Sequence, residues 1–92
     1  MTNAEIINNL NSRRGEISNA SQVTFFECTH RKQDGGDHQV IVEIHDHGNQ
    51  VSLDARYSVF ARDADDPRIC VSGNDQPHIE AALAVVNWRA LG

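Results

Sequence analysis

Cysteine and long apolar runs are both scarce in this 92-residue sequence. Cys28 and Cys70 are the only cysteines, too few for the disulfide framework of many small secreted domains, and we interpret both as small buried hydrophobic side chains. No apolar stretch approaches the roughly 20 residues that a membrane-spanning helix requires. Residues 1–5 lack the basic start and apolar core of a signal peptide, so we expect a cytoplasmic protein.

Lysine is scarce as well. Lys32 is the only lysine, and eight lysines and arginines face 13 aspartates and glutamates, which gives a net charge of -5. This balance opposes nonspecific binding to duplex DNA or to an anionic membrane, because such binding needs clustered cations. We expect neither as a partner, and we expect acidic patches to meet basic patches of another protein.

The length fits one domain, residues 1–92. A chain of this size buries only roughly 60–65% of its unfolded surface, so a deep substrate pocket would remove much of the core. We therefore expect a binding protein and not an enzyme, with no cofactor.

The first third of the chain predicts a helix and a strand. Thr2 and Glu5 have the spacing of a capping box, and the apolar residues that follow recur at helical spacing, which predicts a helix over residues 3–12. Residues 22–30 are rich in β-branched and aromatic side chains and predict a strand, followed by a glycine-containing turn at residues 34–37.

Alternating apolar and polar residues predict two further strands, at residues 40–45 and 51–59. If Gly48 and Asn49 form a two-residue hairpin loop, the two strands pair in one register. In that register the apolar residues face each other in three pairs: Ile44 with Leu53, Val42 with Ala55, and Val40 with Tyr57.

The last third predicts a fourth strand over residues 68–72 and a helix over residues 76–90, whose core stripe is Ile79, Ala82, Leu83, Val86 and Ala90. The fold class is therefore α+β: a four-stranded antiparallel meander sheet with a short N-terminal helix and a longer C-terminal helix packed on it.

Several histidines and cysteines invite a metal hypothesis. Cys28 and His30 share one strand face, and so do His45 and His47. In the expected hairpin, however, His45 pairs near Thr24, about 13 Å from Cys28, whereas zinc needs all its ligands within about 2.3 Å of one point. We expect no metal site, and interpret these histidines as solvated groups at strand ends.

Two arrangements resemble catalytic pairs. Cys28 and His30 lie too far apart on one strand for direct activation of the thiol. Glu43 and Asp54 would lie almost opposite each other on the outer sheet face, but Arg56 would neutralise the pair as a diagonal neighbour. We expect no catalytic residues.

Aromatic side chains raise the possibility of RNA binding. Phe60 and one of Phe25 or Phe26 should project from the outer sheet face with Ile41 and Arg56, a combination that can stack on bases. The alternative is that the N-terminal helix covers this face. A glycine-rich phosphate loop is absent from the sequence.

Two charged segments are candidates for contact with a partner. Asp63, Asp65 and Asp66 form an acidic loop that could imitate phosphates toward an arginine-rich groove, or be a solvated turn. Arg31 and Lys32, at the first hairpin, could contact RNA phosphate or a partner's acidic groups.

The opening TNAEIINNLNSRRGEISNA, followed by VTFFECTH, resembles the small type I-F anti-CRISPR proteins of bacteriophages, in an acidic chain without catalytic signatures. This resemblance implies a protein of the infected bacterial host's cytoplasm that binds Cas subunits of the RNA-guided surveillance complex, with possible contacts to guide RNA, and blocks target DNA binding.

A cellular binding or regulatory module is the alternative function. The expected order of elements approximates the α-β-β-β-α layout of double-stranded-RNA-binding domains, but the final helix lacks the basic residues of that family. We also expect a monomer, because neither a heptad seam nor a long apolar edge strand stands out.

Overall fold

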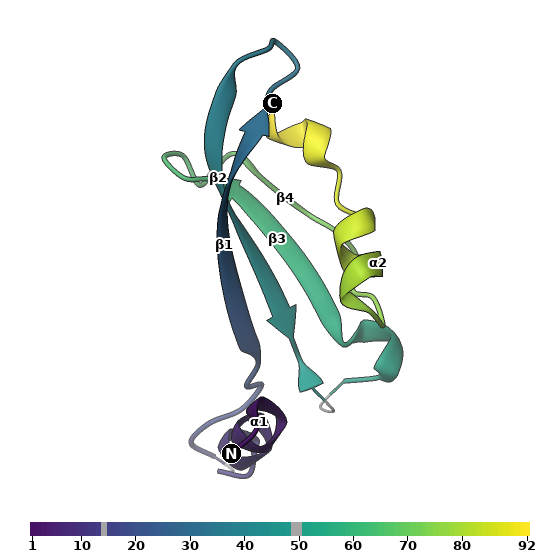
Figure 1. Cartoon of the computed structure of the whole chain (residues 1–92). Helices are drawn as coiled ribbons and strands as arrows, with labels where there is room; N and C mark the ends of the chain where they lie inside the picture. Colours follow the sequence, from purple (N-terminus) through teal and green to yellow (C-terminus); the bar gives the residue numbers. More distant parts are fainter. Residues whose placement is uncertain (14, 49–50) are drawn as a thin grey trace.

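The protein is an antiparallel sheet with helical segments at one end and along one face (Figure 1). The computed structural model describes residues 1–13, 15–48 and 51–92. The strand order is β1-β2-β3-β4, so the predicted α+β meander is confirmed. The elements are α1 (Asn3–Asn11), β1 (Gln22–Arg31), β2 (Asp37–Asp46), the 3-10 helix η2 (Leu53–Ala55), β3 (Tyr57–Asp63), β4 (Cys70–Ser72), α2 (Ile79–Ala84) and the 3-10 helix η3 (Trp88–Leu91).

Helix α1 begins with the predicted capping box. The Thr2 hydroxyl accepts a hydrogen bond from the Glu5 backbone N–H at 3.2 Å, and the Glu5 side chain returns to the Thr2 backbone N–H. Ile7 is the buried residue of this helix, and its side chain lies against Gly48. Helix α1 therefore lies beyond the end of the sheet and leaves the outer face open (Figure 1). No helix in the described parts of the chain is long and apolar enough to cross a membrane.

The register between β2 and β3 differs from the predicted one. Ile44 lies opposite Val59, Val42 opposite Ala61, and Val40 opposite Asp63. Leu53, the predicted partner of Ile44, lies in η2 and is 74% exposed. The partner of Ile44 is displaced by six residues, an even number, so the same faces remain buried in both registers. Asn49, the second residue of the predicted turn, lies outside the described residues.

Hydrogen bonds hold together the two ends of the connection between β2 and β3. The His47 backbone N–H donates to the Arg56 carbonyl at 2.9 Å, and the Arg56 guanidinium pairs with Asp46 at 2.9 and 3.2 Å. These contacts favour the longer connection, because a two-residue turn at Gly48 would leave Arg56 on the outer sheet face and away from Asp46.

The C-terminal segment is two short helices and not one continuous helix over residues 76–90. Gln76 cannot begin a helix because its backbone exchanges two hydrogen bonds with Tyr57, at 2.8 and 2.9 Å, and helix α2 starts at Ile79. Helix α2 ends at Ala84, and Asn87 has a non-helical backbone with φ -84° and ψ 83°.

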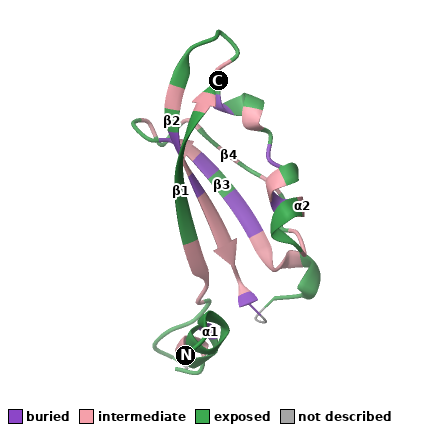
Figure 2. Ribbon diagram, viewed as in Figure 1, coloured by how far each residue is buried: buried purple, intermediate pink, exposed green. Residues whose placement is uncertain are grey.

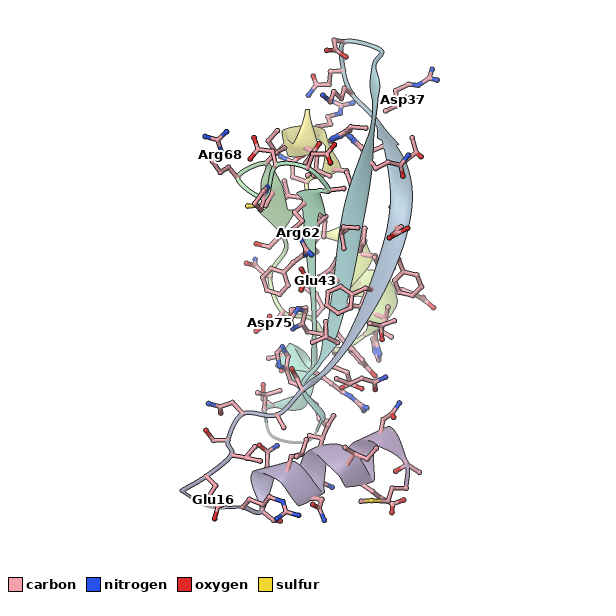
Figure 3. The ribbon with its side chains drawn as sticks, turned by 90° about the vertical axis from the view of Figure 1, so that its left-hand side faces the viewer. Glu16, Asp37, Glu43, Arg62, Arg68 and Asp75 are labelled. Atoms are coloured by element: carbon pink, nitrogen blue, oxygen red, sulfur yellow. The ribbon has the colours of Figure 1, made fainter. Side chains whose placement is uncertain are left out.

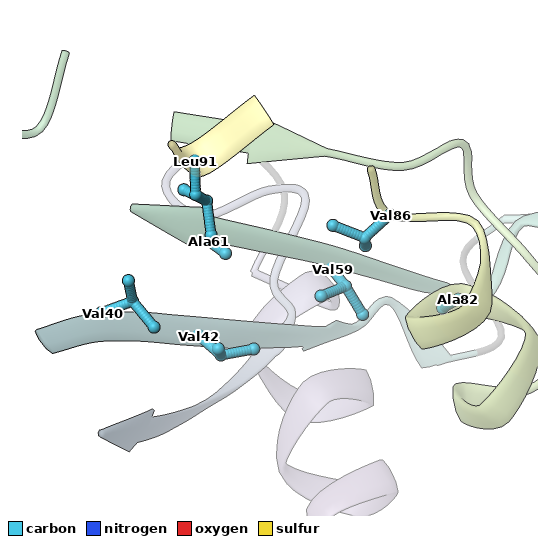
Figure 4. Close-up of a cluster of buried hydrophobic side chains, with 7 residues drawn as sticks. All are labelled: Val40, Val42, Val59, Ala61, Ala82, Val86 and Leu91. Carbon is cyan, nitrogen blue, oxygen red and sulfur yellow. The ribbon is translucent and has the colours of Figure 1, made fainter. Parts of the chain in front are cut away.

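The core lies between the sheet and these two helices (Figure 4). The break after α2 turns Leu91 inward, to 1% exposure, and leaves Ala90 exposed, whereas the predicted stripe contained Ala90 and not Leu91. The buried cluster consists of Val40, Val42, Val59, Ala61, Ala82, Val86 and Leu91.

Both cysteines are exposed, so their predicted burial is wrong. Cys28 lies on β1 and Cys70 on β4, the two edge strands of the sheet. The middle of β1 is exposed on both faces, which Figure 2 shows as a continuous green stretch. The sequence pattern of β1 is that of a buried strand, but the described parts of this small chain do not cover its middle.

Candidate binding surface at the hairpin end of the sheet

Three hydrogen-bonded side chains form a row across the sheet near the β1–β2 turn. His30 and His38 are directly opposite each other in β1 and β2, and their ring nitrogens Nδ1 and Nε2 lie 2.8 Å apart. His38 Nδ1 in turn lies 2.5 Å from Asp63 Oδ2. The His38 and Asp63 side chains are 8% and 11% exposed, so this contact is largely shielded from solvent.

Asp63 is the anionic end of this row of side chains. The hydrogen bond from His38, followed by those from the backbone N–H groups of Asp65 and Asp66, lowers the pKa of Asp63 from 3.8 to about 2. Because Asp63 is ionised at neutral pH, it accepts a hydrogen bond, and His38 must donate through Nδ1. In neutral His38 the second ring nitrogen, Nε2, then carries no proton and accepts the hydrogen bond that His30 donates through Nδ1.

The same carboxylate fixes the β3–β4 loop. Asp63 Oδ1 accepts hydrogen bonds from the backbone N–H groups of Asp65, at 2.8 Å, and Asp66, at 2.9 Å. Asp66 forms a two-bond ion pair with Arg68, at 3.0 and 3.1 Å, and this guanidinium lowers the pKa of Asp66. The loop therefore holds a defined shape through its own polar contacts.

The three predicted contact aspartates consequently have different environments. Asp63 is the last residue of β3 and is buried, and it does not lie in an exposed loop as the sequence suggested. Asp66 is half-buried and paired, and Asp65 is exposed. The sequence pattern DADD gives no signal that separates these roles, which depend on the position of His38 across the sheet.

The two predicted cations lie at the adjacent β1–β2 turn. The Arg31 side chain is 77% exposed and lies 3.4 Å from Asp37, a weak surface pair. Lys32 packs its stem against Gly92. Gln33 holds the turn to the C-terminal segment, since its side chain donates to the Arg89 carbonyl at 3.1 Å.

The β1–β2 turn and the β3–β4 loop lie at the same end of the sheet (Figure 1), linked by the His38–Asp63 contact. The structure thus brings together all five predicted contact residues, although only four of them face outward. We call this region the hairpin-end surface, and Figure 3 shows Asp37 and Arg68 toward its two sides. It consists of Arg31, Lys32, Asp37, Asp65, Asp66 and Arg68.

The outer sheet face carries the predicted aromatic residues. Phe25 is 59% exposed and Phe60 is 41% exposed. His45 packs edge-on against Phe60, with ring centroids 4.9 Å apart, and burial lowers the pKa of His45. Among the described residues of this face, Arg62 is paired with Glu43, and Glu27 on β1 has no arginine partner, so the face is aromatic without being basic.

The arginine of this face differs from the predicted one. Arg62 forms an ion pair with Glu43 here, as Figure 3 shows, whereas Arg56 lies at the end of the sheet over Tyr57. Asp54, expected opposite Glu43, lies in η2, and Phe60 takes the opposite position. In the described residues no group of three or more histidine, cysteine, aspartate or glutamate side chains is arranged to hold a metal ion.

Comparisons with protein-family models, with curated proteins and with solved structures find no match to this chain.

Proposed function

We propose that this protein is a small inhibitor that binds Cas subunits of a type I-F RNA-guided surveillance complex and thereby blocks binding of target DNA. The resemblance of the opening residues to type I-F anti-CRISPR proteins suggests this target. The hairpin-end surface is the single structural feature that supports the proposal best, because it presents charges of both signs on a fixed backbone.

Electrostatic complementarity is the physical reason. A channel that holds guide RNA and target DNA is lined by arginine and lysine, and the exposed Asp65 carboxylate could pair with these cations in place of DNA phosphates. Arg31 and Lys32, on the neighbouring turn, could meet guide-RNA phosphates or acidic side chains. One surface could therefore contact both the protein wall and the RNA of such a channel.

The hydrogen bonds around Asp63 contribute by fixing this surface before it binds. The Ala64 backbone N–H donates to the Gln39 carbonyl at 2.9 Å, and the Gln33 backbone N–H donates to the Gly92 carbonyl at 2.5 Å, so both connections are held to neighbouring elements. A preformed surface loses less conformational entropy on binding than a flexible loop does.

The alternative layout of double-stranded-RNA-binding domains differs from this fold. The strand β4 gives the sheet four strands where that layout has three, and α2 carries Glu80 as its one ionisable residue. The described structure therefore provides no basic helix for a duplex.

The test is co-elution of the purified protein with a reconstituted type I-F surveillance complex, followed by a mobility-shift assay with target DNA. We expect a stable complex that no longer binds DNA. The variants Asp65→Lys and Arg31→Glu should weaken both effects at least tenfold. Glu16→Lys and Arg13→Glu make the same charge changes at the far end of the molecule and should leave both effects unchanged.

Two outcomes would count against this function. Failure of the wild-type protein to co-elute would reject the surveillance complex as the target. Co-elution that the two far-end variants reduce as much as the hairpin-end variants would reject the hairpin-end surface as the contact.

A further inference from the structure

Strand β1 forms one edge of the sheet along its whole length. It spans ten residues, each paired with β2 in an uninterrupted register, and no other described element pairs with its outer edge (Figure 1). Residues 24–29 are all exposed. The opposite edge, β4, has only three residues.

This edge lacks the features that normally prevent strands from pairing between molecules. Edge strands are usually short, or carry lysine, proline or a bulge. β1 contains neither lysine nor proline, and with His30 neutral its formal charges are those of one glutamate, Glu27, and one arginine, Arg31. The strand is therefore near neutral in a chain of net charge -5. The sequence predicted a monomer on the ground that no long apolar edge strand stood out. β1 is a ten-residue edge strand, so that ground does not hold.

One hydrogen bond fixes which backbone groups point outward. The Lys32 N–H donates to the Gly36 carbonyl at 2.7 Å across the β1–β2 turn. Backbone groups alternate in direction along a strand, so the even-numbered residues of β1 bond to β2. The odd-numbered residues Val23, Phe25, Glu27 and Thr29 then direct their N–H and C=O groups to the free edge.

We propose that β1 pairs antiparallel with β1 of a second copy of this chain, about a two-fold axis that passes beside Phe26. A two-fold axis perpendicular to the sheet places even residues opposite even residues and odd opposite odd. Centring the axis on Phe26, near the middle of the strand, lets almost the whole strand pair and forms roughly eight backbone hydrogen bonds over residues 23–29. The two sheets then become one eight-stranded sheet.

The charges of β1 are compatible with this register. Phe25 lies opposite Glu27 of the second copy, and Arg31 lies opposite Ser21, so no like charges lie directly opposite each other, and the two Glu27 side chains are diagonal neighbours. The remaining charge of each chain repels the other copy, and added salt screens that repulsion. Dimerisation should therefore strengthen as the salt concentration rises to physiological levels.

The side chains of both faces gain partners in the dimer. On the helix face, Phe26 is 51% exposed beside an apolar recess that Val42, Ile44, Leu83 and Trp88 also line. The second Phe26 would pack against the first and cover this recess. On the outer face, the Phe25 side chains of the two copies become diagonal neighbours, within reach of aromatic contact.

Analytical ultracentrifugation of the full chain over a concentration series tests the dimer directly, and does so without any Cas protein. We expect the wild type to reach twice the monomer mass. Phe26→Glu should raise the dissociation constant of the dimer at least tenfold, because it places two carboxylates against each other at the two-fold axis. Phe60→Glu is the matched control, since Phe60 is similarly exposed but lies on β3, and it should remain dimeric.

A disulfide cross-link tests the register independently of Phe26. In a Cys70→Ser background, Thr24→Cys places the introduced thiol opposite Cys28 of the second copy, in a non-hydrogen-bonded pair that a disulfide can bridge. Mild oxidation should give a covalent dimer, whereas Cys70→Ser alone should give none, because the two Cys28 side chains lie about 13 Å apart along the strand. A monomeric mass at every concentration would overturn the proposal. So would a dimer that Phe26→Glu does not weaken and that Thr24→Cys does not cross-link.

Discussion

His38 Nδ1 and Asp63 Oδ2, 2.5 Å apart, join the start of β2 to the last residue of β3. Asp63 also accepts hydrogen bonds from the backbone N–H groups of Asp65 and Asp66 in the β3–β4 loop. One carboxylate thus connects the β1–β2 hairpin, through His38 and His30, to the acidic loop. The shape of the hairpin-end surface depends on this carboxylate remaining ionised.

Asp63→Asn should reduce the change in the free energy of unfolding as the pH is lowered below about 4. The pKa of Asp63 is about 2 in the folded protein and 3.8 ordinarily, so its ionised form stabilises the fold above about pH 4. This stabilisation is lost as the pH falls from about 4 to 2. Asparagine can still accept the two backbone hydrogen bonds but carries no charge, so the variant should be less stable at pH 7 and lose less below pH 4. Urea denaturation at a series of pH values measures both effects.

The matched control is Asp65→Asn, since Asp65 is the exposed carboxylate two residues away. We expect its acid profile to follow the wild type. Equal flattening in the two variants would mean that Asp63 has no special role.

His38→Gln should raise the pKa of Asp63 toward 3.8. The hydrogen bond from His38 is the largest cause of the lowered pKa, and glutamine supplies at most a neutral donor. Carboxyl chemical shifts followed by NMR between pH 1.5 and 5 would locate the midpoint. The pKa should stay below 3.8, because the backbone N–H groups of Asp65 and Asp66 still donate to the carboxylate. An unchanged midpoint would contradict the contact.

Val59→Ala and Leu53→Ala distinguish the observed β2–β3 register from the one predicted by the sequence. Val59 is 0% exposed and Leu53 is 74% exposed. We expect Val59→Ala to lower the free energy of unfolding by about 2 kcal/mol and Leu53→Ala by less than about 0.5 kcal/mol. Comparable losses in both variants would favour the predicted hairpin, in which Leu53 packs against Ile44.

The sequence predicts the elements of this fold better than it predicts their register. Capping by Thr2 and Glu5, and the alternation along β2, are local signals, and both elements form where expected. The register is not local: Val59 and Leu53 have the same parity, so either can face Ile44 without exposing the core face. The contact between Arg56 and Asp46 favours the observed register, and the periodicity of the sequence does not reveal this contact.

The candidate site was predictable only in part. Charge alone identified Arg31, Lys32 and the acidic loop, and the structure brings them to one end of the sheet. The contact of His38 with Asp63 depends on which β3 residue lies opposite Val40, so the wrong register concealed it. The same dependence explains why Asp63 was interpreted as an exposed residue.

Leu91→Ala tests the break in the C-terminal helix. Leu91 is 1% exposed, and its truncation should cost about 2–5 kcal/mol of unfolding free energy, measured by urea denaturation. Ala90→Ser is the control: Ala90 is exposed here but would be buried in a continuous helix over residues 76–90. We expect the serine variant to change stability by less than about 0.5 kcal/mol. The reverse ranking would support the continuous helix.

Gly73→Ala should destabilise the junction between β4 and α2. A Cβ atom at Gly73 would lie 2.6 Å from Val85 Cγ2 and 3.3 Å from the Val85 carbonyl carbon, so both the side chain and the backbone would have to shift. Overpacking of this kind costs about 1–3 kcal/mol. Val85 is 43% exposed, so Val85→Ala alone should cost little, while it removes the shorter of the two clashes. The double variant should therefore recover part of the loss, and a thermal melt of all four proteins measures the coupling. Strictly additive effects would show that the two residues do not contact each other.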